Sequence, residues 1–310
     1  MRPRPASGGR WHGAFGRLRE AFSLLREAVA AWSDDHVPSM GAALAYYTVF
    51  SIAPMLVIAI AVAGLVFGAE AARGEIVQEL RGLMGEQGAQ AVEALIRSAA
   101  KPHEGIAATA VAVCVLLVGA TSVFVELQSA LDRIWHAPEK TREGLWAMLR
   151  ARLLSFGMIL GLGFLLTVSL VLSAVVSALG KVWGPYLGAW LLVAEALNFV
   201  FGLGLVTVMF AMIYKLMPNV PVRWRDVWTG AAVTALLFTI GKVLIGLYIG
   251  RSGVTSSFGA AGSLVVLLLW VYYSAQIFLL GAEFTRAYAR RRIAQAHAHG
   301  RPTGGPVGSR

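Results

Sequence analysis

Charged and amide side chains inside long apolar runs are the residues of this sequence best placed to do chemistry. Glu195 and Asn198 stand three residues apart in one run, and Lys242 lies in the next. At 1.5 Å per helical residue, Glu195 and Lys242 would lie about 10–12 Å from the same end of two antiparallel helices. A charge within a membrane-spanning helix is costly, so we expect an ion pair, or a polar pathway that Asn198 extends. A structural pair, or a lysine that reaches outward along the lipid boundary, remains the alternative.

A second acidic candidate closes the last apolar run. Glu283 ends this run and Arg286 follows one helical turn later. Residues three apart on a helix are neighbours, so we expect a local ion pair between them. Glu283 is also the fourth candidate for the polar pathway, with Glu195, Asn198 and Lys242.

A proline interrupts the first apolar run. Pro54 removes one backbone hydrogen bond, so the sequence predicts a kink there. Tyr46 and Tyr47 precede the proline and give the run a polar half. The three residues are candidates for a gate, although a fixed kink that serves packing is an equal alternative.

The sequence contains no pattern typical of an enzyme. The six histidines are scattered and the single cysteine, Cys114, lies in an apolar run. Paired-cysteine, phosphate-loop, zinc-protease and serine-nucleophile motifs are absent. We therefore expect no catalytic residue, no metal and no cofactor.

The elements that carry these residues are apolar runs of membrane-spanning length. Of 310 residues, 57% are hydrophobic and 14% charged, where a soluble domain has about 25% charged residues. Runs of about 20 apolar residues span a bilayer as helices. The sequence thus predicts an all-α integral membrane protein, a bundle of six transmembrane helices at residues 42–68, 105–125, 153–179, 188–214, 227–250 and 259–282.

Lys and Arg are distributed unevenly among the connections. Six precede the first run, five lie in 126–152, three in 215–226 and six after the last run. The alternate connections, 69–104, 180–187 and 251–258, hold four, one and one. Positive residues concentrate on the cytoplasmic side of a membrane, so we expect both termini on that side. The same distribution accounts for the net charge of +10 without a nucleic-acid partner.

The segments outside the spans divide the chain further. Residues 1–12 and 291–310 are expected to be disordered, which leaves 13–290 as the membrane domain. Apolar residues at three- and four-residue steps from Phe15 to Trp32 predict an amphipathic helix at the cytoplasmic surface, with packing on a soluble partner as the alternative. Residues 69–104 predict an outward-facing segment of two short helices that break near Gly85 or Gly88.

Four stretches carry a resemblance to a known family: MGAALAYYTVFSIAPML (40–56), LQSALDRIW (127–135), YKLMPNVPVRWRDVWTGA (214–231) and SSFGAAGSLVVLLLWVYYSAQIFLLGAEFTRA (256–287). The four stretches occur in the same order as in the YihY/BrkB family of bacterial inner-membrane proteins, which the chain therefore resembles. The resemblance implies six transmembrane helices, cytoplasmic termini and a role in the cell envelope, including serum resistance and lipid or lipopolysaccharide export. Some members carry a ribonuclease BN label, but this chain has no cluster of metal ligands to activate water.

Three functions are compatible with these observations. The leading hypothesis is a transporter or flippase-like protein that moves lipids or other amphiphiles through a polar groove. The alternatives are a non-transporting structural or assembly factor that acts through residues 69–104, and a channel for small solutes or ions. Membrane lipids are the expected partners, together with other envelope proteins for an assembly factor.

Overall fold

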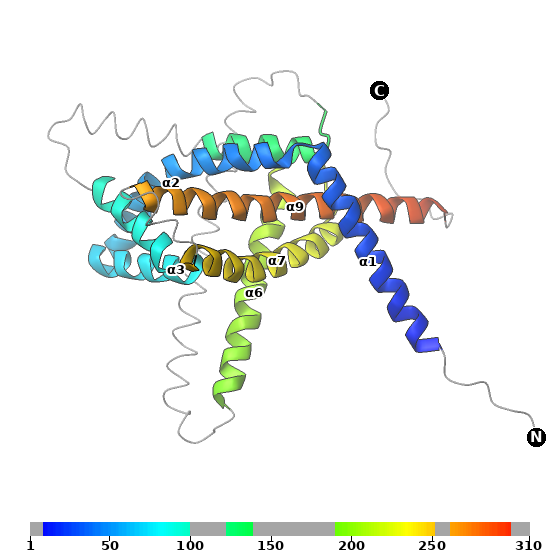
Figure 1. Cartoon of the computed structure of the whole chain (residues 1–310), viewed down its shortest axis with the longest axis horizontal. Helices are drawn as coiled ribbons and strands as arrows, with labels where there is room; N and C mark the ends of the chain where they lie inside the picture. Colours follow the sequence, from blue (N-terminus) through cyan, green and yellow to red (C-terminus); the bar gives the residue numbers. More distant parts are fainter. Residues whose placement is uncertain (1–8, 100–121, 139–189, 252–260, 299–310) are drawn as a thin grey trace, which may run out of the picture.

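A computed structural model describes residues 9–99, 122–138, 190–251 and 261–298 (Figure 1). Its helices are α1 (Gly9–Asp34), α2 (Val37–Phe67), α3 (Ala69–Ala99), α6 (Trp190–Leu216), α7 (Trp224–Arg251) and α9 (Gly262–Ala298). A further helical segment covers residues 122–134, and these ranges contain no strand. The all-α prediction is confirmed for this part of the chain.

Among the described residues, three stretches are long and apolar enough to cross a membrane: Phe199–Leu216, Trp224–Ile249 and Leu264–Gln295. A shorter apolar helix covers Val37–Ile52. The predicted spans at 42–68, 188–214, 227–250 and 259–282 correspond to α2, α6, α7 and α9. The span at 153–179 and nearly all of the span at 105–125 lie outside the described residues, so the count of six stays a prediction.

Residues with positive φ mark the ends and breaks of the first helices. His36 adopts a left-handed conformation (φ 59°) between α1 and α2, and a proline in the first turn of α2 suits a helix start. Gly68 (φ 87°) separates α2 from α3, and Gly85 (φ 77°) divides α3 into two helices. Glycine adopts such angles without steric cost. The predicted break near Gly85 or Gly88 is therefore confirmed, at Gly85.

Two helices extend into segments predicted to be disordered. Helix α1 begins at Gly9, within the segment 1–12, and α9 continues to Ala298, within the segment 291–310. Part of the physical reason is that Arg291 donates hydrogen bonds to Glu27 and Ser23 of α1. These contacts give the basic end of α9 a neighbour to pack on.

Helix α9 lies at the centre of the described bundle. It contacts α1, α2, α3 and α7, and Figure 1 shows α9 between α2 and α7 with α1 crossing its C-terminal part. Helix α3 covers the opposite end. Its residues Val92 and Ile96 pack with Leu267 and Val271 of α9. The apolar side of α3 therefore faces the bundle.

Small residues bring α7 and α9 into close contact. Gly230 of α7 lies against Thr285 of α9, and Gly281 of α9 lies against Thr234 of α7. This reciprocal arrangement makes the two helices antiparallel. A Cβ atom at either glycine would collide with the facing threonine, so the close approach requires glycine at both positions.

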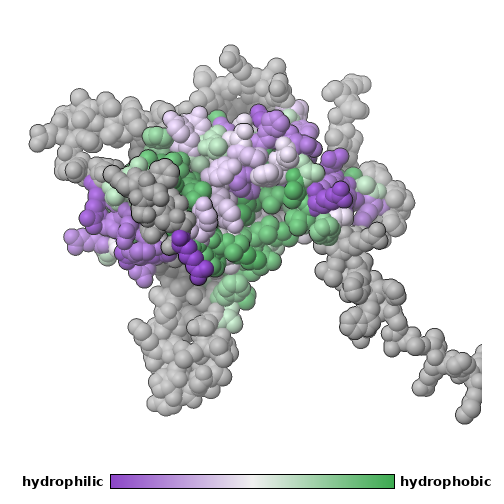
Figure 2. Space-filling view, in the orientation of Figure 1, coloured by the Kyte–Doolittle hydropathy of each residue, from purple (hydrophilic) through white to green (hydrophobic). Residues whose placement is uncertain are grey.

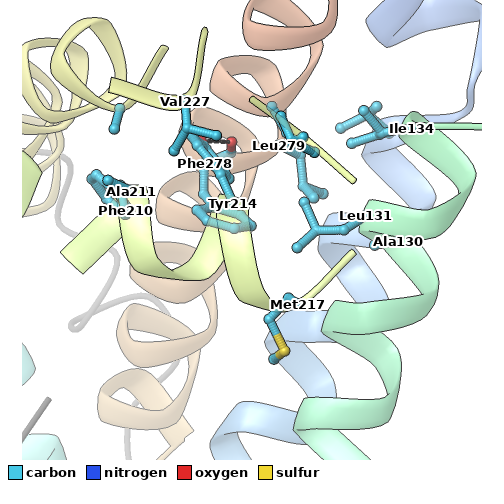
Figure 3. Close-up of a cluster of buried hydrophobic side chains, with 14 of the residues drawn as sticks. Ala130, Leu131, Ile134, Phe210, Ala211, Tyr214, Met217, Val227, Phe278 and Leu279 are labelled. Carbon is cyan, nitrogen blue, oxygen red and sulfur yellow. Dashed lines mark hydrogen bonds between the residues drawn. The ribbon is translucent and has the colours of Figure 1, made fainter. Parts of the chain in front are cut away.

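A buried tyrosine joins α6 to this contact. The Tyr214 hydroxyl donates a hydrogen bond to the Phe278 carbonyl at 2.6 Å and lies 3.1 Å from the Thr234 hydroxyl. Figure 3 shows Tyr214 among buried side chains that include Phe210, Phe278 and Leu279. One side chain thus links three helices through both packing and hydrogen bonds.

Candidate functional site

A row of polar side chains lies between α9 and the junction of α1 with α2. We call this row the polar seam; its members are Trp32, Asp35, Gln276, Glu283 and Arg286. Gln276 and Glu283 are seven residues apart, so they project from the same side of α9 two turns apart. Helices α1 and α2 supply the opposite wall.

The first end of the polar seam is closed by hydrogen bonds. Trp32 Nε1 donates to Gln276 Oε1 at 3.1 Å, and Gln276 Nε2 donates to the Pro38 carbonyl at 3.4 Å. Gly41 packs against the Gln276 amide and leaves no room for a Cβ. Gln276 is therefore held in place by α1 and by the start of α2.

The second end holds two carboxylates and one guanidinium. Glu283 is completely buried. Its Oε2 lies 3.6 Å from Arg286 Nη1, and the same nitrogen donates to Asp35 Oδ2 at 3.2 Å. The predicted local pair of Glu283 with Arg286 is confirmed. The structure adds Asp35 as a second acid on the same cation.

Glu283 is poorly satisfied in this arrangement. Neither of its carboxylate oxygens accepts a hydrogen bond from a described residue. Leaving a buried charged acceptor without a donor costs about 1–3 kcal/mol or more. The Arg286 and Asp35 side chains are 14% and 17% exposed, so the surroundings of Glu283 are not sealed on every side. The site can accept a proton, a cation or a ligand that donates hydrogen bonds.

Two further arginines tie the end of α9 to its neighbours. Arg291 Nε donates to Glu27 Oε2 at 2.9 Å, which links α9 to α1. Arg292 Nη1 donates to Asp226 Oδ1 at 2.7 Å, which links α9 to the start of α7. Asp226 is almost fully buried. These arginines bind carboxylates of the protein, and they flank the polar seam with ion pairs.

The structure separates the predicted pathway residues. Glu283 lies in the polar seam, whereas Lys242 is half-buried on α7. No hydrogen bond or ion pair joins Lys242 to another residue of the described ranges. Glu195 and Asn198 belong to the first part of α6, and their side chains lie outside the described residues. The Glu195–Lys242 pair therefore stays a prediction.

The predicted gate residues lie on α2, outside the polar seam. Tyr46 and Tyr47 are exposed and their rings meet edge-on at 5.6 Å. Phe50 extends the group, with its ring 4.8 Å from that of Tyr46. Helix α2 continues through Pro54 as one element. The side chain of Pro54 lies outside the described residues.

Sequence reasoning missed three members of the polar seam: Trp32, Asp35 and Gln276. Gln276 had a usable signal, because it is an amide in an apolar run two turns before Glu283. Asp35 and Trp32 lie more than 240 positions from their partners, and no local pattern connects them. Across the described ranges, no group of three or more His, Cys, Asp or Glu is placed to hold a metal ion.

A search of protein families matches residues 28–304 to a family model described as Virulence factor BrkB. A UPF0761 membrane protein of Pseudomonas aeruginosa strain LESB58 is 31% identical over 252 residues, which cover 80% of this chain and 58% of that protein.

Two other UPF0761 membrane proteins show the same relation. The one from Verminephrobacter eiseniae is 30% identical over 84% of this chain and 60% of its own length. The one from Alcanivorax borkumensis is 29% identical over 92% of this chain and 65% of its own length. The chain thus spans less than two thirds of these relatives. No solved structure matches it significantly.

Proposed function

The chain belongs to the BrkB virulence-factor family of membrane proteins, and from this premise we propose that it moves a lipid or another amphiphile between the leaflets of the bacterial inner membrane. The family relation supports the membrane setting. The transport step is our own proposal, and it assigns no catalysed reaction to the chain.

The observation that carries the proposal is the state of Glu283. Its helix, α9, is apolar enough to cross a membrane, yet Glu283 is buried there with two carboxylate oxygens that accept no hydrogen bond from the described residues. Ionisable residues in such helices commonly mark the paths of ions and substrates. A head group that carries an amine or hydroxyl groups would supply the missing donors.

Arg286, which is paired with Asp35, gives this site a cation for the anionic part of a lipid head group. Arg286 can bind a phosphate or carboxylate, and Asp35 competes for the same guanidinium at 3.2 Å. An arriving anion would exchange with Asp35, while Glu283 would receive the cationic or hydroxyl part. The acyl chains would stay in lipid, alongside apolar surface such as the exposed side chains of α7.

The assembly-factor alternative predicts a docking surface on α3. The apolar side of α3 packs against α2 and α9, so only its charged face is available for a partner. A channel would need no lipid at the polar seam and would conduct ions in the pure protein. Both alternatives can be separated from lipid movement in one reconstituted system.

Leaflet exchange in liposomes tests the proposal. Purified protein is reconstituted with fluorescent phospholipids, and the fraction that an external quencher reaches is followed with time. We expect exchange well above that of empty liposomes, and a tenfold or greater reduction in Glu283→Gln. Glu195→Gln and Lys242→Met test the pathway predicted from the sequence.

Glu93→Gln is the matched control. Glu93 is also a carboxylate in ion pairs, with Arg97 and Arg73, but it lies on α3 and outside the polar seam. This variant should exchange lipid at the wild-type rate. Wild-type exchange equal to that of empty liposomes would overturn the proposal, and ion currents without exchange would select the channel.

A further inference from the structure

We propose that the start of α7 binds an anionic phospholipid through a patch of cations and indoles, namely Lys215, Arg223, Trp224, Arg225 and Trp228. We call these residues the indole–cation patch. The site is separate from the polar seam and does not depend on lipid movement. Its ligand is a resident phospholipid of the leaflet predicted to be cytoplasmic.

The cations of the patch exceed the acids around them. Arg223 and Arg225 are exposed, and no carboxylate of the described residues pairs with either of them or with Lys215. Asp226, the one acid between residues 215 and 231, is already bound to Arg292. The N-terminus of α7 adds partial positive charge at the same place. The patch is thus complementary to an anionic head group.

The indoles define the depth of the patch in the bilayer. Trp224 and Trp228 are one turn apart and are 49% and 45% exposed. Lys215 donates to the Val222 carbonyl, and its Nζ lies 5.6 Å from the centre of the Trp224 ring. Tryptophan concentrates at membrane interfaces, where its ring meets both lipid and water. The head-group level therefore crosses α7 near these residues.

An apolar stripe continues from the indoles along α7. Exposed residues follow Trp228 at four-residue steps, namely Ala232, Leu236 and Ile240, and Leu247 lies about two turns further on. The three larger side chains, Leu236, Ile240 and Leu247, are about half exposed. Figure 2 shows hydrophobic surface over α7. One leaflet is about 15 Å of hydrocarbon, or about ten helical residues, which is the distance from Trp228 to the region of Leu236 and Ile240. Acyl chains fit along the stripe while the head group meets the cations.

This combination selects a lipid over a soluble anion. A soluble anion would use only the cations, whereas the indoles and the stripe add contacts for a glycerol backbone and acyl chains. The cytoplasmic leaflet is rich in anionic lipids that attract clustered Lys and Arg. Phosphatidylglycerol represents this class in the test, and phosphatidylcholine with the same acyl chains is the uncharged comparison.

Native mass spectrometry of the full chain, released from detergent and titrated with each lipid, measures binding. We expect wild type to bind phosphatidylglycerol at least fivefold more tightly than phosphatidylcholine. Arg225→Gln should weaken this preference several-fold, and Arg223→Gln combined with Arg225→Gln should abolish it. Both arginines are exposed, so the variants should fold.

Arg251→Gln is the matched control, because Arg251 is an exposed arginine at the other end of the same helix. It should keep the wild-type preference. Equal binding of the two lipids by wild type would overturn the proposal, as would an equal loss in Arg251→Gln. Displacement of phosphatidylglycerol by millimolar inorganic phosphate would identify an anion site instead. None of these outcomes alters the exchange assay on Glu283, so the two proposals can fail separately.

Discussion

Glu283 is a buried acid whose charge is unfavourable for folding and is also the group that would bind a ligand. Its side chain is withdrawn from solvent, and its cation, Arg286, is shared with Asp35. Three charged groups therefore leave one negative charge without a counterion when both acids are ionised. Desolvation makes such a charge unfavourable, and a ligand that neutralises it would be bound correspondingly well.

The same reasoning predicts that Glu283→Gln stabilises the protein while it slows lipid exchange. Glutamine keeps the shape and removes the charge, so we expect a gain in unfolding free energy of about 1–3 kcal/mol. Thermal melting of the purified protein in detergent measures the change. Glu93→Gln, at a more exposed pair, should alter stability by about 1 kcal/mol or less. A lower melting temperature for Glu283→Gln would mean that a donor outside the described residues already satisfies the carboxylate.

At the scale of helices, the contact between α7 and α9 positions the residues on either side of it. The reciprocal Gly–Thr packing sets the separation of the two helices, and Arg292 with Asp226 ties them at one end. Each threonine also donates to a carbonyl of its own helix, Thr234 to Gly230 and Thr285 to Gly281. The hydroxyls are thereby satisfied without a partner across the contact.

Gly281→Ala should therefore destabilise the bundle. The new methyl group would collide with Thr234 and approach the Tyr214 hydroxyl, and overpacking of this kind costs about 1–3 kcal/mol. Gly246→Ala is the control, because nothing lies within 4 Å of a Cβ there. Adding Thr234→Ala to Gly281→Ala should restore part of the loss. Equal melting temperatures for the two single variants would contradict the packing described for α7 and α9.

At the scale of the whole molecule, the two ends of the bundle differ in character. One end carries α1, the basic end of α9 and the indole–cation patch, and α3 covers the other (Figure 1). The end with the basic side chains holds segments that the distribution of Lys and Arg predicts to be cytoplasmic. The other end holds α3, which belongs to a connection predicted to face outward. The two ends also provide exposed positions that report orientation, Glu75 on α3 and Arg290 on α9.

Cysteine labelling tests the predicted orientation. With Cys114→Ser as background, Glu75→Cys should react with a membrane-impermeant maleimide in right-side-out spheroplasts. Arg290→Cys should react only after the membrane is permeabilised, because the C-terminus is predicted to be cytoplasmic. Labelling of Arg290→Cys in intact spheroplasts, with Glu75→Cys protected, would reverse the orientation and move the indole–cation patch to the outer leaflet.

Features that depend on neighbours along the chain could be predicted from the amino-acid sequence. Long apolar runs identified α2, α6, α7 and α9, because hydrophobic length is a local property. Gly85 marked the break in α3, and Glu283 with Arg286 followed from helical spacing. The continuation of α9 to Ala298 did not follow from the sequence, because basic composition could not show that acids of other helices would bind those arginines.

Contacts between residues far apart in the sequence became known from the packing of the helices. Asp35 and Arg286 are 251 positions apart, and Asp226 and Arg292 are 66 apart. Their contacts follow from the central place of α9 between α2 and α7, which is set by how side chains interlock across helices. Hydrophobic periodicity specifies that a helix has an apolar face, but it does not specify which helix covers it. The polar seam forms because α1 and α2 are the helices that pack against this side of α9.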